Sequence, residues 1–136
     1  MKSSRLTIAV AFMFFALLAP AVAETGALRA TIPFDFTVGA QTLPAGDYEV
    51  SIRGSLLMVT RTDGPGTAMK LTTLIGGGWN QDVRPRLIFH CYGNHRFLSV
   101  AWMRGANHGH DLQAPTAELE YARMTKQEQK IVLASR

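Results

Sequence analysis

The sequence predicts a small antiparallel β-sandwich or partly closed barrel of about six or seven strands, with one C-terminal α-helix. Three observations lead to this prediction. Apolar and polar residues alternate along several segments, as they do in strands with one buried face. Clusters of Gly, Pro, Asn and Asp separate these segments, as turns do. From Pro115 onward, the alternation gives way to residues that favour helices.

The first predicted strand runs from 28 to 38. Its even positions are all apolar and its odd positions are mostly polar, which is the pattern of a half-buried strand. Pro33 indicates a sheet edge or a bulge, because proline cannot donate a ladder hydrogen bond. A turn at 43–46, which reads Leu-Pro-Ala-Gly, leads into a second strand over 47–53, with Tyr48 facing inward.

Two more strands follow, and a loop comes after them. The third strand covers 56–61, and the reverse turn at 63–66 reads Asp-Gly-Pro-Gly. In the fourth strand, the apolar residues at 69, 71 and 75 share one face. The segment 76–82 begins with three glycines and contains Trp79, and it is predicted to be a loop.

The clearest hairpin pairs 86–92 with 95–103 across the two-residue turn Gly93-Asn94. If Tyr92 lies opposite His95, the register defines two faces. The face expected to join the core carries Leu87, Phe89, Leu98, Val100 and Trp102, with Cys91 and Arg96 at its tip. The other face is amphipathic and carries Ile88, His90, Tyr92, His95, Phe97 and Ser99.

The C-terminal segment predicts a helix near 115–129. Pro115 suits the first helical turn, acidic residues lie near this end, and Lys126 and Lys130 lie near the other, as the helix dipole favours. Residues 131–133 are expected to form a short final strand.

Residues 1–23 are predicted to be a cleavable secretory signal peptide. The apolar run at 6–18 follows a basic start and is too short to cross about 30 Å of hydrocarbon as a helix. The sequence Ala-Val-Ala at 21–23 supplies the cleavage pattern. We therefore expect an exported protein of the periplasm or the extracellular space. Residues 24–136 would form a single β-rich domain with no membrane span after signal cleavage. The alternative for residues 1–23 is an uncleaved membrane anchor.

The charge and cysteine content limit the possible partners and bonds. Two of the 14 basic residues lie in the signal segment, so 12 basic and ten acidic residues remain, with a net charge of +2. The basic residues are scattered, which argues against a nucleic-acid partner. Cys91 is the single cysteine, so no intrachain disulfide forms. The sequence is compatible with a free thiol at Cys91 and with an intermolecular disulfide. Arg96 would favour the thiolate of Cys91, whereas partial burial would leave the thiol inert.

Several motifs resemble those of a family of uncharacterised exported bacterial proteins. They read I-P-F-D-F-T-V-G at 32–39, L-P-A-G-D-Y-E-V at 43–50, L-I-F-H-C-Y-G at 87–93 and F-L-S-V-A-W at 97–102, with A-E-L-E at 117–120. The resemblance covers 30 to about 122, and it implies no activity, substrate or catalytic residue. This chain departs from the family pattern at Cys91, His108 and His110. These residues are therefore poor candidates for a function that the family shares.

The most suggestive chemical motif is His-Gly-His-Asp at 108–111. Two imidazoles two residues apart in an extended segment lie on one side, and Asp111 would be a third ligand or would orient a ring. Zinc or copper suits such ligands. The alternative is that His108 and His110 are solvated residues of a glycine-rich loop. His90 and His95 would join the site only if that loop folds back over the hairpin.

The leading functional hypothesis is a non-enzymatic binding or structural module of the cell envelope or the extracellular space, with an unknown partner. The ligand-binding candidates are Trp79, His90, Tyr92 and His95, which belong to the predicted loop and to the amphipathic face of the hairpin. The first alternative is a transition-metal-binding protein that uses His108, His110 and Asp111. A small extracytoplasmic hydrolase is the second. We predict no catalytic residue, because neither a nucleophile elbow nor a phosphate-binding loop occurs.

Overall fold

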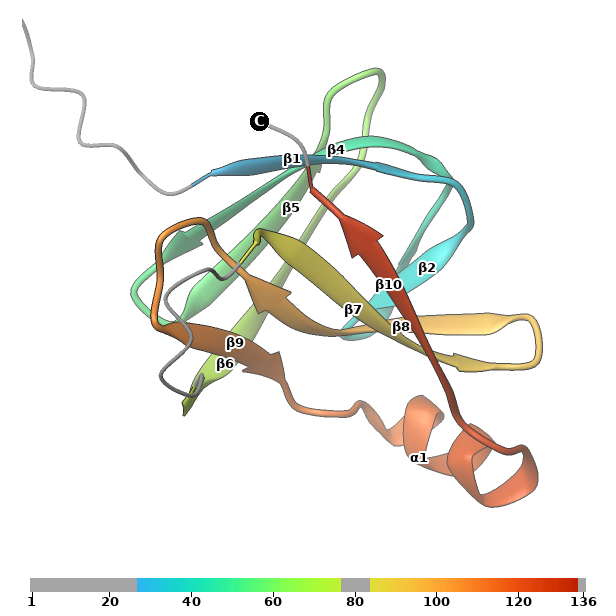
Figure 1. Ribbon diagram of the computed structural model, residues 1–136. Coiled ribbons are helices and arrows are strands. Elements are labelled where there is room, and N and C mark those ends of the chain that lie inside the picture. The colour runs from blue at the N-terminus through green and yellow to red at the C-terminus, as the bar shows by residue number, and fades with distance from the viewer. Residues whose placement is uncertain (1–26, 77–83, 135–136) are drawn as a thin grey trace, which may run out of the picture.

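The computed structural model describes residues 27–76 and 84–134 of the chain. This part of the chain forms ten strands in a curved mixed sheet, with one helix at its end (Figure 1). In chain order the elements are β1 (Leu28–Ile32), β2 (Phe36–Val38), β3 (Gln41–Leu43), β4 (Gly46–Arg53), β5 (Leu56–Arg61), β6 (Thr67–Gly76), β7 (Arg86–Tyr92), β8 (His95–Trp102), β9 (His108–Leu112), α1 (Thr116–Met124) and β10 (Glu128–Leu133). The predicted signal peptide and most of the predicted loop at 76–82, including Trp79, lie outside the described residues.

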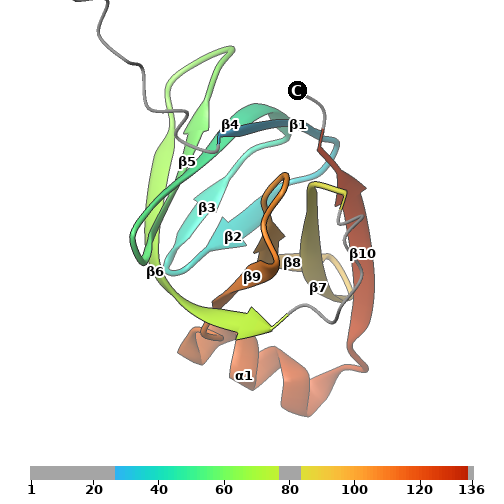
Figure 2. The same cartoon turned by 60° about the vertical axis from the view of Figure 1, so that its left-hand side comes forward.

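The first half of the sheet is an antiparallel run in the order β1-β4-β5-β6. The long strand β6 joins it to the second half, because residues 67–71 pair with β5 and residues 72–76 pair with β9. The sheet bends along β6, so that the two halves enclose a common interior (Figure 2).

Strand β8 organises the second half. One of its edges pairs with β7, which in turn pairs with β10. Its other edge pairs with β9 through residues 100–102 and, in parallel, with β2 at Thr37 and Phe97. The sheet is therefore mixed, whereas the sequence predicts a purely antiparallel one. Within the described ranges, β1 and β10 each pair with one strand, so the sheet does not close into a barrel.

The core lies between the two halves and has an aromatic centre. Phe36 packs edge-on against Tyr48 and Phe89, with ring centroids 5.0 Å and 5.5 Å apart. Each such pair adds about 0.5–1.5 kcal/mol to the gain from burial alone. The largest fully buried side chains come from both halves: Tyr48, Phe36, Phe89, Ile32, Leu57, Leu87, Val38, Val50 and Val59.

The structure confirms a mainly β fold with one helix, but the strand count exceeds the predicted six or seven. The predicted strand at 28–38 is two strands, because the chain turns a corner between β1 and β2 directly after Pro33. Asp35 stabilises this corner, since its Oδ1 accepts a hydrogen bond from the backbone N–H of Ala45 at 3.0 Å. The short β3, which pairs with β2, was not predicted, and neither was β9.

The hairpin register is correct near the turn and wrong beyond it. The pairs from Tyr92–His95 to Phe89–Leu98 are those predicted, but a bulge then places Ile88 opposite Val100. A bulge adds one residue to one strand, so the side chains that follow change face. As a result Ala101 faces the core and Val100 leaves it. Trp102 is buried as predicted, but it packs against Gly109 on the other face.

The helix is shorter than predicted and the last strand is longer. α1 ends at Met124 rather than near 129, because Thr125 is already extended with φ −138° and ψ 143°. Residues 128–133 instead form β10, whose ladder with β7 supplies the backbone hydrogen bonds that a longer helix would have made internally. No helix in the described part of the chain has the length and apolar character needed to cross a membrane.

Candidate functional site

Three groups of residues are candidates for a functional site: a polar cluster under α1, the histidine pair on β9, and an apolar surface on β5 and β6.

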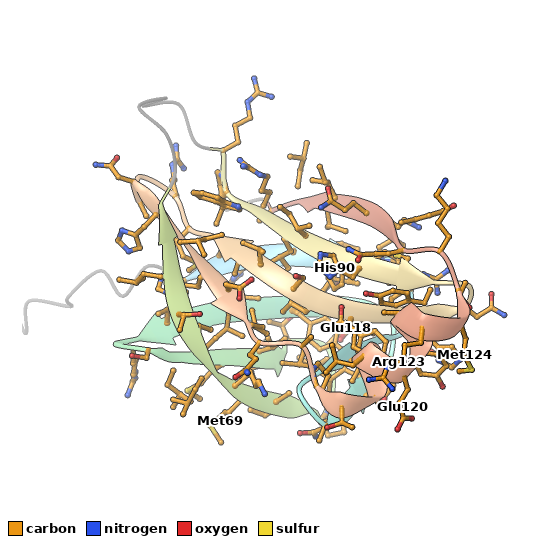
Figure 3. The ribbon with its side chains drawn as sticks, turned by 90° about the horizontal axis from the view of Figure 1, so that it is seen from below. Met69, His90, Glu118, Glu120, Arg123 and Met124 are labelled. Carbon is orange, nitrogen blue, oxygen red and sulfur yellow. The ribbon has the colours of Figure 1, made fainter. Side chains whose placement is uncertain are left out.

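The polar cluster forms where α1 lies across the outer face of the β7–β8 hairpin. Glu118 of α1 is only 3% exposed. Its Oε1 lies 2.9 Å from His90 Nδ1 and accepts a hydrogen bond from the Tyr92 hydroxyl at 3.2 Å. Figure 3 shows Glu118 reaching from the helix toward His90. This carboxylate therefore links the helix to two residues of β7.

Aromatic contacts complete the attachment of the helix. Tyr121 of α1 stacks on His95, with ring centroids 3.9 Å apart, and lies 6.0 Å from Phe97. Glu118 and Tyr121 are three residues apart and so share one helix face. The apolar residues Leu119 and Met124 point away from the sheet and are exposed. α1 is thus held by a buried carboxylate and an aromatic stack rather than by an apolar stripe.

The cluster changes the acidity of Tyr92. Burial, together with the charge and the hydrogen bond of Glu118, raises the pKa of Tyr92 to about 12. The phenol therefore stays protonated at neutral pH and keeps its donated hydrogen bond. Within the described residues, the hydrogen bond of the His90 side chain is to Glu118, so the geometry fits the attachment of α1 better than proton transfer.

The structure places three of the predicted ligand-binding residues on the face of the hairpin that α1 covers. Tyr92 is buried, His90 is half-buried, and both lie under α1 with the stacked ring of His95 beside them. The physical reason is the helix, whose docking position the sequence does not indicate. The fourth predicted residue, Trp79, lies outside the described residues.

Sequence reasoning missed the central residue of this cluster. The sequence identifies Glu118 only as one of the acidic residues near the start of the predicted helix. One signal was available, because Glu118 and Tyr121 share a helix face while His90 and Tyr92 share a strand face. Nothing in the sequence states, however, that these two faces meet.

The second candidate is the histidine pair, which lies on strand β9 and not in a loop. His108 is exposed, whereas His110 is buried, and their ring centroids are 5.4 Å apart. β9 pairs with both β6 and β8, and this pairing holds the segment in an extended conformation. Asp111 follows His110 in the strand and so points to the opposite face, which removes it as a third ligand. Within the ranges described, no group of three or more His, Cys, Asp or Glu is placed to hold a metal ion.

The third candidate is an exposed apolar surface on the outer face of β5 and β6. Leu56 lies opposite Leu71, and Met58 lies opposite Met69. Residues directly opposite in an antiparallel pair share a face, so these four residues form one block, which we call the Met-Leu block. Met69 is 59% exposed and Leu71 is 68% exposed. Figure 3 shows Met69 pointing away from the body of the molecule.

The remaining chemical candidate is Cys91, which faces the core. The thiol is buried, and burial raises the pKa of Cys91 despite the opposing charges of Arg96 and Lys130. A protonated, buried thiol reacts slowly, so the structure favours the inert alternative for this residue.

Comparisons with known protein families, curated proteins and solved structures found no match for this chain.

Proposed function

We propose that this chain is an exported, non-enzymatic binding module and that the Met-Leu block is its binding surface. The observation that carries this proposal is the inverted polarity of β6. Its core side holds Ala68 and Thr72, whereas its large apolar residues Met69 and Leu71 point outward. A strand that only served the core would have the opposite pattern.

The shape and composition of the block support a protein partner. The outer face of an antiparallel sheet is broad and nearly flat, and contiguous exposed apolar surface is typical of interaction sites. Methionine side chains adapt to irregular partner surfaces. On the neighbouring strand β4, the exposed Arg53 lies opposite Leu56 and places a positive charge at the rim. We therefore expect a partner with an apolar surface and an acidic residue beside it.

The polar contacts of the chain support binding more than hydrolysis through a side-chain nucleophile. That mechanism requires a hydroxyl or thiol whose proton a base can accept. The one hydroxyl–imidazole contact of the described residues joins Thr72 and His110, but the Thr72 hydroxyl donates its proton to the Ser55 carbonyl at 3.0 Å. His110 therefore cannot act as the base for Thr72.

The proposal is tested by site-specific photocrosslinking in the native host. A photoreactive residue replaces Met69 in one variant and Thr31 in a matched control. Thr31 lies on the polar, exposed outer face of β1 in the same half of the sheet. We expect an adduct of defined mass from position 69 and none from position 31. The adduct should disappear when Leu56→Ser and Leu71→Ser are added to the position-69 variant.

Two results would contradict this function. Equal adducts from positions 69 and 31 would mean that the block has no special affinity. An adduct with twice the mass of the chain would assign the block to self-association and would overturn a separate partner.

A further inference from the structure

The face of β9 that carries His108 and His110 is held in a fixed geometry by its neighbours. Gly109 lies between the two histidines and points to the other face, toward Trp102 and Ile75. A Cβ atom at position 109 would lie 2.9 Å from Cε2 of Trp102, which is closer than side-chain packing permits. The glycine thus lets the Trp102 ring pack directly on the backbone between the two histidines.

The hydrogen bonds of Thr72 determine which nitrogen of His110 carries the proton. The Thr72 hydroxyl has one proton and donates it to the Ser55 carbonyl at 3.0 Å. Thr72 Oγ1 also lies 3.2 Å from His110 Nδ1, so it must accept a hydrogen bond from that nitrogen. In neutral His110, the proton is therefore on Nδ1 and the lone pair is on Nε2.

This arrangement is the one that orients a metal-binding histidine. A histidine ligand generally donates its second ring N–H to a nearby oxygen, which fixes the tautomer and the ring plane. The hydrogen bond of the His110 ring to the described residues is at Nδ1, so the lone pair of Nε2 is the one left to bind a metal ion.

The spacing of the two rings fits one shared ion. A metal–nitrogen bond of about 2.0–2.1 Å places an ion roughly 3.2 Å from the centre of an imidazole ring. If both rings point a nitrogen at the ion, centroids 5.4 Å apart correspond to an N–metal–N angle of about 115°, close to the tetrahedral value that zinc prefers. The exposed His108 side chain is free to turn a nitrogen toward such an ion.

We propose that His108 and His110 form a two-imidazole site for a transition-metal ion of the zinc or copper type, with water in the remaining coordination positions. Thr72 is a positioning residue of this site, and Asp111 is outside it. The site uses none of the residues of the Met-Leu block, so the two proposals stand or fall separately.

The test is a calorimetric titration of the exported chain, purified without an affinity tag, with Zn²⁺, Cu²⁺ and Mg²⁺. We expect one ion of Zn²⁺ or Cu²⁺ per chain, tighter binding of Cu²⁺ than of Zn²⁺, and no binding of the hard ion Mg²⁺. His108→Ala should weaken binding at least tenfold, because it removes one of two protein ligands. His108 is exposed, so this variant should remain folded.

Matched variants separate ligands from neighbours. His95→Ala removes an exposed histidine from the hairpin, and Asp111→Asn removes the neighbouring carboxylate; both should bind as the wild type does. Thr72→Val should weaken binding about tenfold, as loss of an outer-shell hydrogen bond does. Electron paramagnetic resonance of the Cu²⁺ form should show two coupled nitrogens in the wild type and one in His108→Ala.

Three outcomes would overturn the site. The first is unchanged affinity in His108→Ala, and the second is equal loss in His95→Ala. The third is a Cu²⁺ spectrum whose nitrogen couplings do not change in His108→Ala.

Discussion

The outer face of β7 and β8 and the outer face of β5 and β6 belong to the same sheet but have different surroundings. On the first, α1 covers the aromatic residues Tyr92 and Phe97, which are buried. On the second, Met69 and Leu71 remain exposed. Among the described residues, α1 is the one helix; it covers the first face only, and a buried carboxylate attaches it there. This difference supports the proposal that the bare face is the binding surface.

The covered face should be sensitive to loss of its carboxylate. Glu118→Ala leaves the polar groups of His90 and Tyr92 without their partner under the helix. We expect the free energy of unfolding to fall by about 2–3 kcal/mol, because a buried charged hydrogen-bond partner is lost. Urea unfolding followed by circular dichroism measures this change.

Glu120→Ala is the matched control for this experiment. Glu120 lies on the same helix two residues away and is exposed (Figure 3). Its removal should change the free energy of unfolding by less than about 0.5 kcal/mol. Equal effects of the two variants would mean that Glu118 does not hold the helix.

A smaller effect is expected for Tyr92 on the same face. Tyr92→Phe removes one donor to Glu118 but keeps the aromatic ring and the contact between Glu118 and His90, so we expect a loss of about 1 kcal/mol. In the wild type, the pKa of Tyr92 is about 12, above the usual value of 10. The folded state therefore resists ionisation, and stability should decrease as the pH rises from about 10 to about 12. Absorbance at 295 nm should show a titration step near pH 12 that is missing in Tyr92→Phe.

The sequence was sufficient for the features that depend on local patterns. Alternation located the strands, and the Gly93-Asn94 turn fixed the register from Tyr92 to Phe89. The bulge near Ser99 has no comparable local signal, so the prediction of Val100 as a core residue was wrong. The length of α1 was equally hard to predict, because the end of this helix depends on the pairing of β10 with the distant strand β7.

The candidate sites were less predictable because they depend on contacts between distant segments. The histidine motif was visible in the sequence, but its hydrogen bond to Thr72 joins residues 38 positions apart. The link between Glu118 and His90 spans 28 positions. Periodicity predicted that Met69 and Leu71 share a face, but it did not show that this face points to solvent. Burial depends on which half of the sheet lies opposite, and that is a property of the whole fold.

His110 lies on β9, opposite Leu74 of β6. It should make the stability of the fold depend on pH. Burial lowers the pKa of His110, so near and below pH 6.5 the unfolded chain binds a proton that the folded chain resists. Stability should therefore be unaffected by this group well above pH 6.5 and should decrease as the pH falls through that value. The urea midpoint, measured from pH 8 to pH 5, tests this sign. His110→Gln keeps a donor for Thr72 and should flatten the curve, whereas an equally steep curve in this variant would exclude His110 as the cause.

The bare face should show the smallest effect on stability, and this result would sharpen the comparison most. Met69→Ser with Leu71→Ser removes two exposed apolar side chains, so we expect the free energy of unfolding to change by less than about 0.5 kcal/mol for each substitution. Val59→Ser, on the buried face of the neighbouring strand β5, is the contrasting variant and should be strongly destabilising because it buries an unpaired hydroxyl and leaves a cavity. A large loss of stability in the Met69 and Leu71 variant would mean that these residues support the fold. A small loss would support the proposed binding role, because it would show that these side chains contribute little to folding.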